Sequence, residues 1–66
     1  MEIVLNGEPR EVAAALSVQQ LLQLDGLAER RVAVEVNGEI VPRSRHGERL
    51  LAAGDRIEIV HALGGG

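Results

Sequence analysis

The stretch LSVQQLLQLDGL, residues 16–27, carries the sharpest local signal in the sequence. Ser17 is a favourable N-cap residue, and Gln20 stands three positions later, which completes the pattern of a capping box. Leu16 before the cap and Leu21 after it are spaced as a hydrophobic staple. These residues predict that a helix begins near Ser17.

The same stretch also predicts the buried face and the end of the helix. Val18, Leu21 and Leu22 recur at helical spacing and form one apolar stripe. Gly26 tolerates the left-handed conformation that ends many helices, and Leu27 beyond it can pack back on Leu22. We therefore expect one long amphipathic helix that stops at Gly26.

Strand patterns flank this helix on both sides. Residues 2–6 and 31–36 are rich in strand formers, and each run leads into an Asn-Gly pair, Asn6-Gly7 or Asn37-Gly38. Asn-Gly favours the two-residue turn of a β-hairpin, because both turn positions need a positive φ. Residues 8–12 and the stretch that starts at Ile40 would be the return strands. Pro9 assigns the first of these to a sheet edge, since proline cannot donate to a strand ladder.

The last strand is predicted at residues 56–60, with Ile57 and Ile59 on its inward side. Leu50 and Leu51 should fill the core from a second, short helical turn near Leu50. The expected core is the following set: Ile3, Leu5, Val18, Leu21, Leu22, Val34, Val36, Leu50, Ile57 and Ile59.

The order of these elements predicts an α+β fold. A hairpin, a crossing helix, a further hairpin and a final strand must share one core. The simplest arrangement lays the helix on one face of a mixed sheet of about five strands, with the first and last strands parallel and central. That arrangement is the ubiquitin-like β-grasp. We expect residues 1–62 to form this domain and residues 63–66 to form a flexible glycine tail.

Composition excludes several function classes. The chain has 66 residues, a net charge of −3, no cysteine and no aromatic residue. It therefore has no thiolate metal site, no disulfide and no platform on which nucleic-acid bases could stack. The acidic balance and the lack of a long apolar run argue against nucleic acid and membrane partners, and indicate a soluble cytoplasmic protein. His46 and His61 have no third ligand in view, so we expect no bound metal.

The glycines at positions 64, 65 and 66 point to the chemistry. Glycine costs the most backbone entropy to order and has no side chain to pack, so we expect this tail to be mobile. A backbone without Cβ atoms can enter a narrow channel and present the carboxylate of Gly66 in a partner's active site. That carboxylate can attack the α-phosphate of ATP, and a sulfur nucleophile can then displace the adenylate. A frayed end without function is the alternative.

Val4, Val60 and Ala62 fall on the opposite side of their strands from Ile3, Leu5, Ile57 and Ile59. If no helix covers that side, they form an apolar patch near the tail. Scattered valines are normal on a protein surface, which is the alternative. A contiguous patch beside the tail favours a docking surface for a partner.

Three segments of the sequence resemble the ThiS family of sulfur carriers. They are MEIVLNGE at residues 1–8, VAVEVNGEIVPR at residues 32–43, and GDRIEIV at residues 54–60 continuing to the final glycines. Terminal Gly65-Gly66 alone is common to ubiquitin-like proteins, whereas the central block is more specific. Leu63 departs slightly from the family, which more often carries a β-branched residue there, and we count it with the docking residues.

The resemblance implies a carrier that is not itself an enzyme. A ThiF-type adenylyltransferase would use ATP and magnesium to adenylate Gly66, and a cysteine desulfurase or another persulfide donor would supply sulfur. The thiocarboxylate on Gly66 would then deliver sulfur to the thiazole synthase ThiG in thiamine biosynthesis. The small subunit of molybdopterin synthase, a ubiquitin-like protein modifier and a plain interaction domain remain as alternatives. The chain has no lysine, so it cannot form chains of itself through isopeptide bonds.

Overall fold

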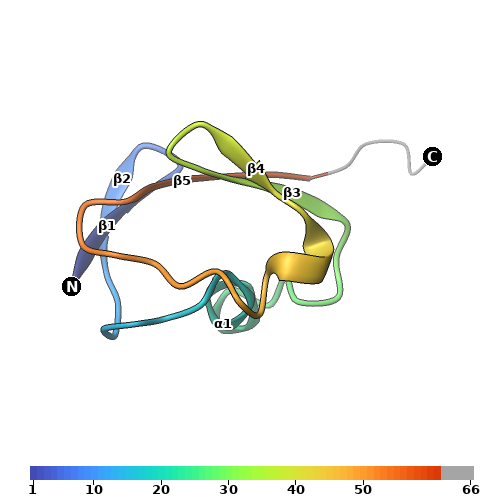
Figure 1. Cartoon of the computed structure of the whole chain (residues 1–66). Helices are drawn as coiled ribbons and strands as arrows, with labels where there is room; N and C mark the ends of the chain where they lie inside the picture. Colours follow the sequence, from blue (N-terminus) through green and yellow to red (C-terminus); the bar gives the residue numbers. More distant parts are fainter. Residues whose placement is uncertain (62–66) are drawn as a thin grey trace.

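The structure is a computed structural model that describes residues 1–61 and consists of one sheet with one helix against it (Figure 1). Five strands form the sheet in the order β2-β1-β5-β3-β4. The elements are β1 (Glu2–Leu5), β2 (Glu8–Glu11), α1 (Val18–Leu24), β3 (Val32–Val36), β4 (Glu39–Val41), a 3₁₀ helix (Arg43–Arg45) and β5 (Arg56–His61).

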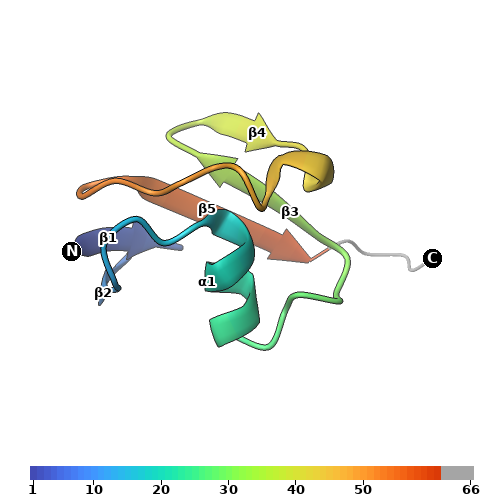
Figure 2. The same ribbon diagram turned by 60° about the horizontal axis from the view of Figure 1, so that its bottom comes forward.

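The topology confirms the predicted β-grasp. β1 and β5 are parallel neighbours at the centre of the sheet, with Val4 opposite Arg56, and all the other pairs are antiparallel. The crossover from β2 to β3 carries α1, which lies against one face of the sheet (Figure 2). Both Asn-Gly pairs form the expected turns, because Asn6, Gly7, Asn37 and Gly38 all have positive φ.

α1 begins and ends as its sequence predicts. The Ser17 Oγ accepts from the backbone N–H of Gln20 at 3.1 Å, and the Gln20 side chain accepts from the backbone N–H of Ser17 at 2.9 Å. At the other end the N–H of Leu27 donates to the carbonyl of Leu22 at 2.7 Å, which is the long bond of a Schellman ending. The helix is shorter than expected, with seven residues or about two turns.

The core lies between α1 and the inner face of the sheet. Eight of the ten predicted core residues are buried, and Leu5 is half-buried against the cluster. The tenth prediction, Leu50, is wrong because its side chain is 53% exposed. The backbone of Leu50 forms a bridge with Ser17, and its neighbour Leu51 is the residue that enters the core. Val12, Leu16, Val41 and Leu51 complete the cluster.

The predicted position of the second helical turn is also wrong. It lies at Arg43–Arg45 and not near Leu50. Pro42, with a φ of −59°, precedes it, and its carbonyl accepts from the N–H of Arg45 at 2.8 Å. The buried His46 ends the turn, with its Nε2 3.0 Å from the carbonyl oxygen of Val41. This contact gives His46 a packing role.

An ion pair that the sequence did not reveal ties β2 to the end of α1. The two Nη atoms of Arg10 donate to the two carboxylate oxygens of Asp25 at 2.8 and 2.6 Å. The hydrogen bonds from Arg10, opposed by partial burial and helped by its charge, lower the pKa of the Asp25 carboxyl below its usual range. The pair therefore links two segments that are 15 residues apart in the sequence.

Candidate functional site

The last strand before the glycine-rich end of the sequence, β5, lies at the centre of the sheet. β5 is paired on both sides, with β1 and with β3, and Ile57 and Ile59 anchor it in the core. Its last residue, His61, is exposed and lies opposite Val32 of β3. This pairing fixes the point from which the sequence continues to Ala62.

Residues 62–66 lie outside the described part of the chain. They comprise the predicted docking residues Ala62 and Leu63 and the three glycines of the predicted tail, Gly64, Gly65 and Gly66. The docking role of Ala62 and Leu63 stays a prediction. The expected mobility of the tail, the domain boundary after residue 62 and the sulfur-carrying role of Gly66 therefore stay predictions.

The face of the sheet opposite α1 carries Val4 and Val60, as the strand phases predict. Val4 is half-buried, whereas Val60 is 61% exposed. The register places Val4 opposite Arg56, at the beginning of β5, and Val60 near its end, with Glu58 between them on the same face. Val4 and Val60 therefore do not touch as one compact patch.

Other apolar residues lie closer to Val60. Ala33 is directly opposite Val60 in the ladder between β3 and β5. Ile40 of β4, 63% exposed, lies opposite Glu35, the next residue of β3 on this face. The positions of Ala33 and Ile40 on this face could be predicted from the sequence, because both alternate with the buried valines of the second hairpin. We call Ala33, Ile40 and Val60 the apolar edge of the open face.

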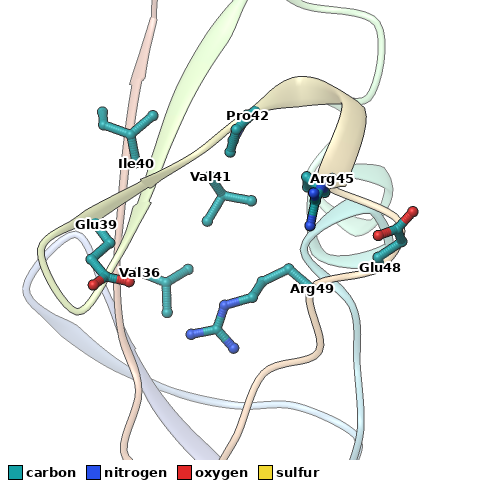
Figure 3. Close-up of a pocket in the computed structure, with 8 residues that line it drawn as sticks. All are labelled: Val36, Glu39, Ile40, Val41, Pro42, Arg45, Glu48 and Arg49. Carbon is teal, nitrogen blue, oxygen red and sulfur yellow. The ribbon is translucent and has the colours of Figure 1, made fainter.

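A surface pocket of about 290 Å³ lies on the other side of β4 (Figure 3). Its walls are β4 and the segment that follows the 3₁₀ helix, and Arg45 and Arg49 contribute charge. The Nη1 of Arg49 donates to the carbonyl of Leu50 at 2.7 Å. The pocket is lined by Val36, Glu39, Ile40, Val41, Pro42, Arg45, Glu48 and Arg49.

A second surface cavity, of about 370 Å³, lies between α1 and the 3₁₀ helix. Its lining includes Ala28, from the loop after α1, and Arg43 and Ser44, from the 3₁₀ helix. Arg43, Arg45 and Arg49, which are close in the sequence, divide between the two cavities. Arg43 lines the second cavity, whereas Arg45 and Arg49 both line the first pocket, and the N–H of Arg49 donates to the carbonyl of Arg45 at 3.0 Å.

Residues 1–61 contain no group of three or more His, Cys, Asp or Glu side chains placed to hold a metal ion. His46 is engaged with Val41, and His61 lies exposed at the end of β5. None of the helices in this part of the chain has the length and apolarity needed to cross a lipid bilayer.

Known proteins are similar to this chain in sequence and in fold. The family model described as the ThiS family matches residues 3–66. The chain is 46% identical over all 66 residues to a thiazole synthase of Paramagnetospirillum magneticum, of which it spans only about a fifth. It is 29% identical, over the whole length of both chains, to the sulfur carrier protein ThiS of Escherichia coli.

A solved structure agrees with these relatives. The crystal structure of the thiamine biosynthesis protein ThiS from Geobacter metallireducens superimposes with a TM-score of 0.87 at 35% identity, and the match covers all of both chains. The family match includes the final glycines, and the structural match includes every strand and the helix described above. The chain belongs to the ThiS family.

Proposed function

We propose that this chain is a sulfur carrier that works through the carboxylate of Gly66 and supplies sulfur for thiazole formation in thiamine biosynthesis. One observation carries the proposal. The ThiS family match runs through Gly66, on a β-grasp domain whose central strand ends at His61, three residues before the first of the final glycines. The names of the matched Escherichia coli and Geobacter proteins support the same role.

The proposed loading begins with activation of the carboxylate. In a polypeptide that ends at Gly66, a carboxylate oxygen attacks the α-phosphorus of ATP, and pyrophosphate leaves with its magnesium ion. The product is an acyl adenylate, a mixed anhydride whose carbonyl carbon is open to a nucleophile. A ThiF-type adenylyltransferase would bind the ATP and magnesium, so this chain acts as the substrate and not as the enzyme.

Sulfur transfer follows on the same carbon. The terminal sulfur of a persulfide, held by a cysteine desulfurase or another donor, attacks the carbonyl and AMP leaves. A second thiolate then breaks the S–S bond, which forms a disulfide on the donor side and frees the thiocarboxylate. The chain has no cysteine and cannot hold a persulfide of its own, so the C-terminal carboxylate is its plausible carrying group.

The recipient in this proposal is a thiazole synthase of the ThiG type. A thiazole synthase contains a region 46% identical to this whole chain, which supports a functional connection between the two. The small subunit of molybdopterin synthase would carry the same thiocarboxylate, but no feature of residues 1–61 favours that assignment.

Mass analysis of the chain from its native host tests the proposal. Replacement of one oxygen by sulfur is expected at the carboxyl end. Oxidation of Met1, the only methionine, gives the same nominal shift, so the sulfur must be localised. Cleavage after Arg56, the last basic residue that trypsin recognises, releases residues 57–66 without Met1.

The shift should appear in that fragment and disappear when the sulfur donor is removed. A carboxyl-terminal fragment of unchanged mass, from cells that are actively making thiamine, would contradict the carrier function. An isopeptide bond from Gly66 to a lysine of another protein would identify a modifier.

A further inference from the structure

Four of the seven arginines gather where β5 ends. Arg30 and Arg31 lie in the loop just before β3, and Arg43 and Arg45 lie on the 3₁₀ helix after β4. All four side chains are exposed. We call these four residues the basic end.

Two independent contacts bring the two pairs to the same end of the molecule. Val32, which follows Arg31, is opposite His61, so the first pair lies beside the end of β5. Ala28 and Arg43 line the same cavity, so the loop before β3 lies beside the 3₁₀ helix. Both ribbon views agree, with the loop and the 3₁₀ helix near the end of β5 (Figures 1 and 2).

The arginines of the basic end are available for a partner. Within residues 1–61, the only arginine in an ion pair is Arg10, which binds Asp25. Two acidic residues lie beside the basic end: Glu29 precedes Arg30 in the loop, and Glu48 lines the same cavity as Arg43. Glu2, Glu11 and Glu39 lie toward the opposite end of the sheet, near the beginning of β5.

The position of the arginines matters more for docking than the net charge of the chain. The net charge of −3 gives no overall attraction to an acidic surface. Fields in physiological salt decay over about 8–10 Å, however, so a docked partner senses the local arginines more than the distant carboxylates. Guanidinium groups also match carboxylates with two parallel hydrogen bonds, which favours Arg over Lys at such a contact.

We propose that the basic end docks on acidic side chains that surround the opening through which a partner enzyme receives the segment after β5. The inference rests on the proposed function, because it concerns the enzyme that adenylates Gly66. The partner is chosen by charge complementarity and by position. A ring of carboxylates at that opening would orient the domain with the end of β5 facing the active site, and would speed association.

Three double variants, each removing two positive charges, test the proposal with the full chain and the purified adenylating enzyme. Arg30→Gln with Arg31→Gln, and Arg43→Gln with Arg45→Gln, remove charge from the basic end. Arg10→Gln with Arg56→Gln removes the same charge away from the basic end, because Arg10 lies on β2 and Arg56 begins β5, and serves as the matched control. Association rates are measured by stopped flow at low and high salt, and melting temperatures verify that each variant is folded.

Each basic-end variant should associate about tenfold more slowly than the wild type at low salt, within the range known for electrostatic steering. The control should stay within about twofold, and added salt should abolish the differences. Equal rates for all three variants, or a salt-independent wild-type rate, would overturn the proposal. Tight wild-type binding to duplex RNA that only the basic-end variants lose, with unchanged association to the enzyme, would also overturn it.

The same measurements separate this inference from the function on which it rests. If the wild type is adenylated but all three double variants associate at the same rate, only the inferred docking surface is wrong. If the wild type with a free Gly66 is not adenylated at all, the proposed function fails and the docking inference fails with it.

Discussion

Leu21 is one of the fully buried residues of the core. Its side chain is fully buried between α1 and the sheet, at the centre of the apolar stripe. Leu21→Ala should lower the free energy of unfolding by about 2–5 kcal/mol, from lost burial and the cavity left behind. In a domain this small that loss approaches the whole stability. Urea unfolding measures it, with Leu24→Ala, on the same helix but 64% exposed, as the control. A loss below about 1 kcal/mol would contradict the burial of this face.

Asp25 makes stability depend on pH in a direction that the Arg10 pair determines. Because the folded pKa lies below the usual value of 3.8, the unfolded chain binds the proton more readily. The contribution is fully present above that value and is lost as the pH falls through the folded pKa. Both side chains are partly exposed, so the gain should be about 1 kcal/mol or less.

Asp25→Asn tests this contribution. The stability difference between wild type and variant should be present near neutral pH and should narrow below pH 3.8. Acid titration of the melting temperature measures it, and Glu29→Gln, an exposed acidic residue without an ion pair in residues 1–61, is the control. A constant difference at every pH would mean that the ion pair does not contribute.

Gly66 should be indispensable for loading and irrelevant to stability. Its deletion retracts the carboxylate by up to about 3.3–3.6 Å, whereas a misplacement of about 1 Å can cost a hundredfold in rate. Adding one residue replaces the reacting carboxylate with an amide. Both changes should abolish adenylation by the cognate enzyme, measured as pyrophosphate release, and leave the melting temperature unchanged. A truncated chain that loads at the normal rate would remove Gly66 from the mechanism.

At the scale of elements, α1 depends on its ends because it is so short. Seven residues are too few for an isolated helix to be stable in water. Ser17→Ala removes one side of the capping box and should cost about 0.5–2 kcal/mol. Thermal unfolding measures the loss, with Ser44→Ala, at an exposed serine of the 3₁₀ helix, as the control. Equal stability of the two variants would contradict a structural role for the cap.

The elements that the sequence predicts well are those whose signals are local. The caps of α1 and the two Asn-Gly turns each depend on residues within a few positions of one another. Leu50 and Leu51 have no such neighbours, because adjacent residues of an extended segment point to opposite sides and only the bridge to Ser17 selects Leu51. Ala15, with a φ of 61°, shows the same limit, since alanine gives no sign of a left-handed turn.

The candidate site also has features that depend on local sequence and features that depend on long-range pairing. The phases of Val4 and Val60 are readable from alternation along each strand, but the distance between them depends on the parallel register of β1 and β5. That register is a long-range property, and it places Glu58 between the two valines. The nearness of Ala33 to Val60 likewise appears only when β3 is paired with β5.

On the scale of the whole molecule, the open face of the sheet should contribute to partner binding. Val60→Asp places a charge on the apolar edge, where the side chain is already exposed, so the fold should survive. Loss of apolar contact is expected to weaken binding to the adenylating enzyme and to thiazole synthase about tenfold or more. Calorimetric titration measures both affinities. Leu24→Asp, equally exposed but on α1, is the matched control and should bind normally.

The outcome distinguishes two uses of the surface. If Val60→Asp binds as tightly as the wild type while Val4→Asp does not, the contact lies near the beginning of β5. If both variants bind normally and remain folded, partners do not use this face of the sheet.

The parallel pairing of β1 with β5 also has a mechanical consequence. A force applied between residue 1 and residue 61 acts along two adjacent strands, so it loads the hydrogen bonds between them in shear. Bonds in shear must break together, whereas the bonds of a pulled hairpin break one after another. β5 is held on its other side by the longer ladder to β3. A partner that pulls on the chain beyond His61 therefore loads both ladders of β5 at once. We expect the domain to resist mechanical unfolding under such a force.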